Sequence, residues 1–492
     1  MPFTMNKLNL IFFLLLIAVL NCFAQPISLH PQNPHYFLFK GKPTVLITSA
    51  EHYGAVLNVD FDYKRYLKTL HDEGMNYTRI FAGSYAEVPG SFGIQHNSLA
   101  PEAGRFIAPW KRTAEPGIFK GENKFDLNEW NPEYFSRLKD FISVAGDYGI
   151  VVEVTFFCST YDDKIWERNP FNPGNNINNL PEYPDRKKSN TLANGSLTAF
   201  QQKLVEKLVT ELNGFDNIFY EIQNEPWADD GFKVMRTLRT LDPQGQQGDW
   251  YKWAEMASPA SLEWQKLIAK TVVDTEARLP KKHLIAQNYT NFMHSLDDVD
   301  PNISILNFHY VWPEAVWYNY AWNRPVSFDE SGFAGKSDST YLRQAWQFMM
   351  AGGAVFNNLD YSFYPGREDG TGTNNAPGGG STTLRKQLSI LRAFIESLDF
   401  VLMKPDAGVV VHSPGSQVQC ISQSGKQYAM VFTGIASKTV KLDLPKGRFN
   451  FEFISPYNGK ILKKGFFTQK KSGIYELKMT EFGEMVALKI TK

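Results

Sequence analysis

Short apolar runs rich in β-branched and aromatic residues alternate with amphipathic stretches from about residue 43 to residue 400. Continuous apolar runs predict buried strands, and apolar residues spaced three and four apart predict helices. One helix has a clear start, because Asn131 can cap it and Pro132 fits its first turn. The predicted strands are 44–48, 75–81, 150–156, 217–223, 283–288, 303–310, 325–330 and 354–361, and the predicted helices are 62–71, 131–148, 198–212, 261–278, 340–350 and 382–397.

Eight strands with helices between most of them fit a (β/α)8 barrel over residues 25–400. An open doubly wound sheet usually has fewer strands and a glycine-rich phosphate turn, and no G-x-G-x-x-G motif follows an early strand. We therefore predict an α/β fold of the TIM-barrel type, with long insertions at 82–131, 158–194 and 227–259.

The pattern changes after about residue 400. Short β-rich runs then recur between Gly, Pro and Ser turns, which predicts a small C-terminal β-sandwich over residues 401–492. This segment holds 14 Lys and Arg against 6 Asp and Glu, whereas the whole chain holds 51 of each. Two independent signals thus indicate a domain boundary near residue 400. The runs are 408–412, 428–432, 449–454 and 485–490.

The N-terminal segment 1–24 has the pattern of a signal peptide. Lys7 precedes an unbroken apolar run that is too short to cross a bilayer as a helix, and small residues follow at cleavage spacing. We predict cleavage after Ala24, and therefore a secreted or periplasmic protein. The alternative is a lipoprotein with its lipid on Cys22, although Asn21 is a poor fit to the small residue that such sites prefer.

The composition excludes several classes of protein. A chain of 492 residues with 43% hydrophobic and 21% charged residues is a large globular protein. Its formal net charge is zero, so we expect no nucleic acid partner, and no stretch predicts a membrane span. After signal cleavage only Cys158 and Cys420 would remain, which excludes a disulfide framework. The chain has no H-E-x-x-H, His-x-His or G-x-S-x-G motif, so we predict no metal and no cofactor.

Two glutamates lie at the carboxyl ends of predicted strands, where a (β/α)8 barrel builds its active site. Glu225 follows the fourth strand and Glu330 ends the seventh, so their side chains can converge across the barrel mouth. Cleavage of a glycosidic bond needs one protonated carboxyl and one ionised carboxylate. A single glutamate at a strand end is more often part of a surface salt bridge, but a pair at matching ends favours catalysis.

These carboxylates belong to longer motifs. Glu225 lies within Glu-x-x-Asn-Glu-Pro at 221–226, and the sixth strand ends on a His-Tyr pair at 309–310. With Glu330, these motifs resemble the retaining glycosidases of clan A, especially the cellulase-like members of glycoside hydrolase family 5, over about residues 40–400. The resemblance implies that Glu225 is the acid/base and Glu330 the nucleophile.

The resemblance also implies roles for neighbouring side chains. Asn224 would hydrogen-bond the sugar 2-hydroxyl, and Tyr310 would donate its hydroxyl to the nucleophile. His309 matches the family's strand-six histidine, and Arg79 matches a strand-two arginine whose charge would favour an ionised nucleophile. Structural alternatives exist, because Tyr310 could fill the barrel mouth and Arg79 could pair with Glu221 inside the barrel.

The chain departs from the family pattern at two strand ends. The family usually has a His where this chain has 156–158, and a Trp where it has 357–361. Cellulose-type specificity should therefore not be carried over. Replacement polar contacts to substrate could come from His52, Asn288 and Asp360, although a structural hydrogen bond explains each of them equally well.

Aromatic residues make up 14% of the chain, and nine of the 11 tryptophans fall in presumed loops after strands. Because sugar rings stack on indole rings, a rim of such loops suits a glycan site, and Trp227 is the best candidate platform. The segment after residue 400 has no Trp, so we interpret it as an accessory domain. The loop tryptophans are Trp110, Trp130, Trp166, Trp227, Trp250, Trp253, Trp312, Trp317 and Trp322.

Together these features predict a secreted retaining glycoside hydrolase acting on a poly- or oligosaccharide. Retention requires the two carboxyl groups to lie about 5 to 5.5 Å apart, and a wider gap would indicate inversion. Two alternatives stay open: a non-catalytic glycan-binding protein, and a transglycosidase that shares the glycosyl-enzyme intermediate. The sequence leaves open the sugar, the linkage, the oligomeric state, the role of the C-terminal domain, and whether the enzyme cuts inside chains or at their ends. The long insertions could wall one side of the cleft, which would favour cutting at chain ends.

Overall fold

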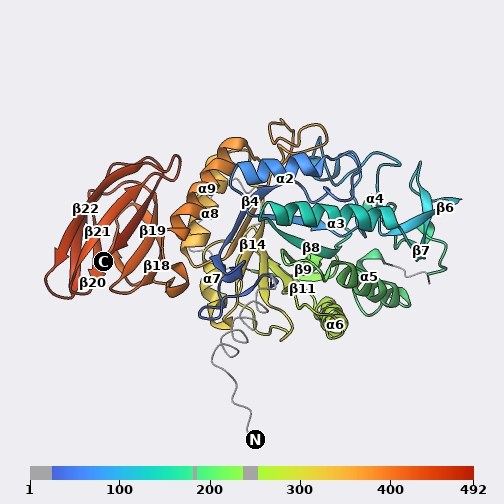
Figure 1. The fold of residues 1–492 in the computed structure, drawn as a ribbon, viewed down its shortest axis with the longest axis horizontal. Helices are drawn as coiled ribbons and strands as arrows, with labels where there is room; N and C mark the ends of the chain where they lie inside the picture. Colours follow the sequence, from blue (N-terminus) through green and yellow to red (C-terminus); the bar gives the residue numbers. More distant parts are fainter. Residues whose placement is uncertain (1–24, 181–184, 236–252) are drawn as a thin grey trace, which may run out of the picture.

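The computed structural model describes residues 25–180, 185–235 and 253–492 (Figure 1). The predicted signal peptide, residues 1–24, and Trp250 lie outside these ranges. Within them, no helix combines the length and the apolar character that crossing a membrane would require.

Eight parallel strands form the central sheet, and they follow one another around it in chain order. Each lies within three residues of its predicted bounds, because these strands are buried on both faces and therefore read as continuous apolar runs. The predicted (β/α)8 barrel is thus confirmed. The strands are β4 (Leu46–Ala50), β5 (Tyr77–Phe81), β8 (Val151–Cys158), β9 (Ile218–Asn224), β12 (Ile285–Asn291), β13 (Ile305–His309), β14 (Val326–Ser331) and β15 (Val355–Leu359).

The barrel closes between its first and second strands through isolated hydrogen bonds. No strand ladder joins β4 to β5 among the described residues. Instead, Asn76 accepts a hydrogen bond from the Ile47 backbone N–H at 2.9 Å and donates one to the Val45 carbonyl at 2.8 Å. The Asn76 N–H also donates to the Ile47 carbonyl at 3.4 Å, and the Phe81 N–H donates to the Tyr53 carbonyl at 3.2 Å. These isolated bonds replace the ladder that joins the other neighbouring strands.

Helices cover the outside of the barrel (Figure 1). The predicted start of α3 is confirmed, since the Asn131 side chain accepts from the Glu133 N–H and Pro132 occupies the first helical position. The apolar face of α3, which includes Phe135, Leu138 and Ile142, is buried in the core. The helices are α2 (Tyr63–Asp72), α3 (Pro132–Asp147), α5 (Leu197–Leu212), α6 (Pro259–Glu276), α7 (Glu314–Asn319), α8 (Asp338–Met350) and α9 (Thr382–Glu396).

Small elements are added to the barrel. A three-stranded antiparallel sheet precedes it, and a hairpin interrupts the insertion after β5 and another the insertion after β9. The second hairpin joins the barrel sheet where Met256 pairs with Thr290 of β12. These elements are β1 (Ser28–Leu29), β2 (Phe37–Phe39), β3 (Lys42–Thr44), β6 (Trp110–Pro116), β7 (Asn123–Trp130), α4 (Asp163–Trp166), β10 (Gly231–Met235) and β11 (Trp253–Ala257).

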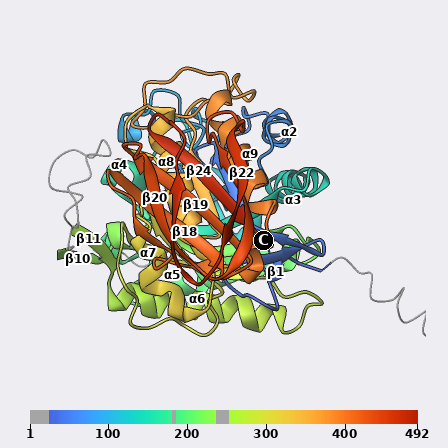
Figure 2. The same cartoon turned by 90° about the vertical axis from the view of Figure 1, so that its left-hand side faces the viewer.

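The C-terminal segment folds into two antiparallel sheets around a core of its own, as predicted. Helices α8 and α9 lie between it and the barrel strands, and Gln347 of α8 donates to the Thr433 hydroxyl (Figures 1 and 2). The boundary near residue 400 remains a prediction. One sheet holds β16 (Lys404–Pro405), β18 (Ser416–Gln423), β19 (Gln427–Gly434), β24 (Met485–Thr491), β21 (Gly447–Ile454) and β22 (Ile461–Gln469), and the other β17 (Val410–His412), β20 (Thr439–Leu444) and β23 (Gly473–Lys478).

Candidate active site

Glu225 and Glu330 meet in one pocket at the carboxyl ends of the barrel strands. Glu225 directly follows β9 and Glu330 is the fifth residue of β14. A carboxylate oxygen of Glu225, one of Glu330 and a ring nitrogen of His309 all lie within 4.8 Å of one another. The pocket that contains both carboxylates has a volume of about 30 Å³. The prediction that these two side chains converge at the barrel mouth is thus confirmed.

Glu330 accepts hydrogen bonds from three side chains. The Tyr310 hydroxyl lies 2.5 Å from Oε1, and the Tyr53 hydroxyl lies 3.1 Å from Oε2. Arg79 Nη1 lies 3.3 Å from Oε2 and adds a permanent positive charge. Burial raises the pKa of both tyrosines well above its usual value, so their hydroxyls keep their protons and donate. Two hydroxyls and a guanidinium therefore fix the position of the Glu330 carboxylate.

Glu225 has fewer and different partners. The Tyr161 hydroxyl donates to Oε2 at 2.7 Å, and His309 Nδ1 lies 2.9 Å from Oε1. Burial opposes a charge on His309, but the carboxylates of Glu330 and Asp329 outweigh it and raise the pKa of the imidazole well above its usual value. The contact at Nδ1 holds Glu225 in place. His309 is fully buried, so it positions Glu225 and does not contact substrate.

Arg79 connects the two halves of the site from below. It is completely buried, forms an ion pair with Glu221 and donates to Asn224 Oδ1 at 2.8 Å as well as to Glu330. Asn224 in turn donates to the Tyr161 hydroxyl at 2.8 Å. We predicted from the sequence that Arg79 contacts substrate, and the structure corrects this. Arg79 has no exposed surface, so it cannot reach a substrate and instead positions Asn224 and Glu330.

A second layer of carboxylates lies deeper in the barrel. Oxygens of Glu153, Glu221 and Asp329 lie within 4.8 Å of one another, and Asn307 Nδ2 donates to all three at 2.7 to 3.1 Å. Burial and the neighbouring carboxylates raise the pKa of Glu153 well above its usual value. The same causes also raise the pKa of Asp329. Arg79 lies within 4.0 Å of all three. Ion pairing and retained protons account for this cluster without a metal ion.

Backbone conformations with positive φ concentrate at this pocket. Nine non-glycine residues among those described have positive φ, and five of them line the pocket. Such conformations cost about 1–3 kcal/mol each in bulky residues and persist where a functional geometry requires them. They mark the pocket as a functional site independently of the carboxylates. The five are Tyr53 (φ 60°), Phe92 (φ 54°), Glu225 (φ 46°), Tyr310 (φ 53°) and Phe333 (φ 56°).

Two predicted substrate contacts are structural instead. Asn288 is fully buried below the pocket, where its Nδ2 lies 2.9 Å from His309 Nε2. Asp360 is also fully buried, pairs with Arg385 at 2.5 Å and accepts from the Ser49 hydroxyl at 2.7 Å. Both therefore stabilise the barrel. His52, the third candidate, does line the pocket.

Trp227 is not an open platform for a sugar. Its side chain is buried, with a relative exposure of 8%, and its ring meets the His309 ring edge to face at 5.5 Å. The left-handed turn at Glu225 leads into a short 3-10 helix, Pro226–Ala228, that carries the indole inward. None of the described tryptophans lines the pocket; Tyr and Phe rings form its aromatic wall. The predicted tryptophan rim around the carboxylates is thus wrong.

Several pocket residues escaped the sequence analysis. Tyr161, Glu87, Phe92 and Phe333 all lie in loops after strands, where no periodicity shows which side chains turn inward. Their only sequence signal was membership of the insertions or of a loop following a catalytic strand. Cys158, the last residue of the segment 156–158 where the resembled family usually has a histidine, also lines the pocket, and it pairs in register with Asn224.

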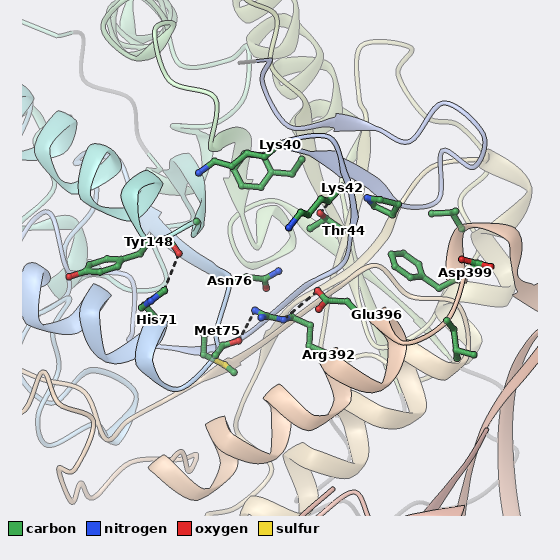
Figure 3. Close-up of a pocket in the computed structure, with 17 residues that line it drawn as sticks. Lys40, Lys42, Thr44, His71, Met75, Asn76, Tyr148, Arg392, Glu396 and Asp399 are labelled. Atoms are coloured by element: carbon green, nitrogen blue, oxygen red, sulfur yellow. Dashed lines mark hydrogen bonds and ion pairs between the residues drawn. The ribbon is translucent and has the colours of Figure 1, made fainter. Parts of the chain in front are cut away.

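A second hollow, of about 680 Å³, lies at the opposite end of the barrel (Figure 3). Its lining includes Thr44, Asn76 and Gly149, which precede β4, β5 and β8. Lys42 and Arg392 face the same space, and Arg392 pairs with Glu396 at 3.4 Å. It contains no carboxylate pair at strand ends, so size alone does not identify the active site. In barrels of this type the amino face serves stability.

The chain shares its fold with structures described as glycoside hydrolases. A candidate glycoside hydrolase from Bacteroides vulgatus has a TM-score of 0.65 and 13% identity, over 95% of this chain and 82% of that one. A glycoside hydrolase family 5 protein from the same organism has a TM-score of 0.59 and 11% identity, over 95% and 93%. A third structure, described as a glycoside hydrolase, has a TM-score of 0.56 and 11% identity, over 95% and 97%.

These likenesses establish the fold. No protein-family model and no curated protein sequence matches the chain. The chemistry must therefore be argued from the side chains of the site.

Proposed function

We propose that the protein is a retaining glycoside hydrolase. The observation that carries this proposal is the approach of Glu225 and Glu330, whose nearest oxygens lie within 4.8 Å at the carboxyl face of the barrel. Retaining enzymes hold their two carboxyl groups about 5–5.5 Å apart, whereas inverting enzymes leave about 6.5–9.5 Å for a water molecule. The approach of the two nearest oxygens to within 4.8 Å supports the shorter, retaining spacing.

The hydrogen bonds support different roles for the two carboxylates. Glu330, with three donors including Arg79, is the group better stabilised as an anion, and it attacks the anomeric carbon. Glu225 gives its proton to the leaving oxygen as the glycosidic bond breaks. It then removes a proton from water, which releases the sugar from Glu330 with its original configuration.

Asn224 completes the proposed machinery. Its amide is fixed at both ends, since Oδ1 accepts from Arg79 and Nδ2 donates to Tyr161. A fixed amide beside the nucleophile suits a hydrogen bond to the sugar 2-hydroxyl, which strengthens as the oxocarbenium-like transition state forms. This contact would exchange with the bond from Asn224 to Tyr161 when substrate binds.

Chemical rescue tests the two assignments separately. Glu330→Ala and Glu225→Ala should each lower turnover of aryl glycosides by about 10³-fold or more, as expected when a group that acts in the transition state is removed. Added azide should then restore product formation. The product should be the inverted glycosyl azide with Glu330→Ala, because azide replaces the nucleophile, and the retained glycosyl azide with Glu225→Ala.

Glu396→Ala, on the amino face, is the matched control and should keep wild-type turnover. Wild-type turnover by Glu330→Ala, or a retained azide product from it, would contradict the proposed mechanism. The substrate we propose is a poly- or oligosaccharide, and export through the segment 1–24 stays a prediction that mass measurement of the mature N-terminus would test.

A further inference from the structure

A third carboxylate lies in the same pocket without a role in the proposed mechanism. Glu87 is buried, with a relative exposure of 2%, and its Oε1 lies 3.1 Å from His52 Nε2. Asn97 donates to its other oxygen, and Arg168 donates to its backbone carbonyl at 2.9 Å. Both Glu87 and His52 line the pocket with Glu225 and Glu330. The Glu87 carboxylate is therefore fixed, and it holds the imidazole.

The hydrogen bond to Glu87 leaves one ring nitrogen of His52 available. Since a carboxylate only accepts, Nε2 carries a hydrogen, and Nδ1 has no hydrogen-bond partner among the described residues. Burial opposes protonation, but Glu87 outweighs it and raises the pKa of His52, which favours a hydrogen on Nδ1 as well. A buried polar atom without a partner is costly unless a ligand satisfies it. A sugar hydroxyl is a suitable acceptor.

The insertion after β5 crosses the carboxyl face of the barrel and encloses the pocket. The centroid of the Phe92 ring lies 5.0 Å from that of Tyr161, in the loop after β8. It lies 6.4 Å from the ring centroid of Phe333, in the loop after β14. Farther along, the backbone N–H of Gln95 donates to the Asn375 carbonyl at 2.8 Å. The insertion is thus tied to loops on both sides, and Glu87 and Leu99 of this insertion also line the pocket.

The enclosed volume limits what can bind. Ligand pockets commonly measure about 300–1000 Å³, and the cavity volume here, about 30 Å³, is far below that range. The loops therefore leave room for no more than one sugar ring beside the carboxylates. Glu330 attacks the anomeric carbon, through which the bound ring is linked to the rest of the chain. An enclosed pocket therefore admits only a ring that carries no further sugar on its non-reducing side.

We propose that the pocket binds the single non-reducing terminal sugar of a chain, and that His52, held by Glu87, donates a hydrogen bond to a hydroxyl of that sugar. This inference rests on the proposed function and deepens it. The enzyme then removes sugars one at a time from chain ends, and the pair of His52 and Glu87 selects which terminal sugar is accepted.

The order of products tests the cutting mode. Gluco-, manno-, galacto- and xylo-tetrasaccharides in α and β linkage, each labelled at the reducing end, are incubated with the full-length enzyme and sampled over time. The inference expects a monosaccharide and a labelled trisaccharide first, then the disaccharide. Labelled disaccharide before trisaccharide would overturn it. No cleavage of any member would instead count against the proposed function, so the two failures are distinguishable.

Deoxy sugars test the role of His52. With aryl glycosides of the preferred sugar, His52→Ala should lower kcat/KM about 10- to 100-fold, as for a lost hydrogen bond from a charged donor. Removing the contacted hydroxyl from the substrate should lower wild-type kcat/KM by a similar factor and should cause no further loss in His52→Ala. If His52→Ala lost activity through misfolding alone, the loss from the variant and the loss from the deoxy substrate would instead multiply.

His96→Ala is the matched control, because His96 is exposed and stacks on Tyr364 outside the pocket lining. It should leave kcat/KM unchanged. Glu87→Gln should reproduce part of the His52→Ala loss, since the amide no longer favours a charged imidazole. Equal penalties for every deoxy substrate in wild type and His52→Ala would overturn the assignment of His52.

Discussion

Tyr310 donates two hydrogen bonds to Glu330, one from its hydroxyl to Oε1 at 2.5 Å and one from its backbone N–H to the carbonyl oxygen at 3.0 Å. Tyr310 does so from a left-handed backbone conformation, with φ of 53°. The ring therefore has little freedom relative to the carboxylate that it contacts. In the proposed mechanism this double contact fixes the direction from which Glu330 attacks.

We expect Tyr310→Phe to lower kcat about 10- to 100-fold with a smaller change in KM. The substitution removes one hydrogen bond to an ionised carboxylate, which is worth about 1.5–3 kcal/mol. Steady-state kinetics on an aryl glycoside measures it. Tyr289→Phe is the control, because the buried Tyr289 hydroxyl has no partner among the described residues and its loss should change nothing. An unchanged kcat in Tyr310→Phe would remove Tyr310 from the machinery.

At Phe92 we expect glycine to be better tolerated than alanine. Phe92 has φ of 54° and a relative exposure of 39%, so its backbone conformation matters more than its burial. Alanine pays about 1 kcal/mol for that conformation and glycine does not. Phe92→Gly should therefore have the higher free energy of unfolding in urea. Both variants should lose activity, since both remove the ring that contacts Tyr161.

The control for this comparison is Phe232, an exposed phenylalanine in the ordinary extended conformation of β10. There the order should reverse, with alanine more stable than glycine. The same order at both positions would mean that the left-handed conformation at Phe92 contributes no strain.

Arg385→Met should lower the free energy of unfolding by about 3–5 kcal/mol, because it leaves buried carboxylates without a cation. Arg385 is fully buried and pairs with both Asp360 and Glu73. Activity per folded molecule should persist, since these residues do not line the pocket. Thermal unfolding and kinetics together test this. Lys68→Met, at an exposed pair with Asp72, should cost less than about 1 kcal/mol.

Asp229 should make the protein less stable as pH rises from about 4 to about 7. Burial raises its pKa from 3.8 to about 7, against the hydrogen bond from the Thr160 N–H. The folded state then holds a proton that the unfolded state has released, so stability is lost through this window, by on the order of 4 kcal/mol in total.

Asp229→Asn should remove this dependence, raising stability at pH 8 and changing it little near pH 4. Urea unfolding at both pH values measures the effect. Replacing the exposed Asp297 by Asn should leave the pH dependence of the wild type in place. An Asp229→Asn variant that is no more stable than wild type at pH 8 would contradict the raised pKa.

The strands and the carboxylate pair were predictable because both depend on local pattern. Strands buried on both faces are continuous apolar runs, and the ends of those runs located Glu225 and Glu330 at one level of the barrel. Tyr310 was found the same way, as the residue after β13. For these residues, position along a strand is enough to determine position in the site.

The rest of the site depends on how loops turn, which spacing does not encode. Trp227 follows Glu225 in the sequence, yet the left-handed turn at Glu225 carries the indole under the site. Conversely, Glu87 and Tyr161 come from insertions without periodicity and still line the pocket. Asp360 lies at a strand end, as Glu225 and Glu330 do. Whether its carboxylate faces substrate or pairs with Arg385 depends on α9, which carries Arg385 25 residues later in the chain.

In the described part of the chain, only isolated hydrogen bonds join β4 to β5, from Asn76 to Val45 and Ile47 and from the Phe81 N–H to the Tyr53 carbonyl, and this gives the barrel a line of weakness along its length. Tyr53 follows β4 and Arg79 belongs to β5, so the two donors to Glu330 Oε2 stand on opposite sides of that line. Local opening there separates these donors while the other seven strand pairings persist. On warming, enzyme activity should therefore be lost at a lower temperature than the fold of the barrel.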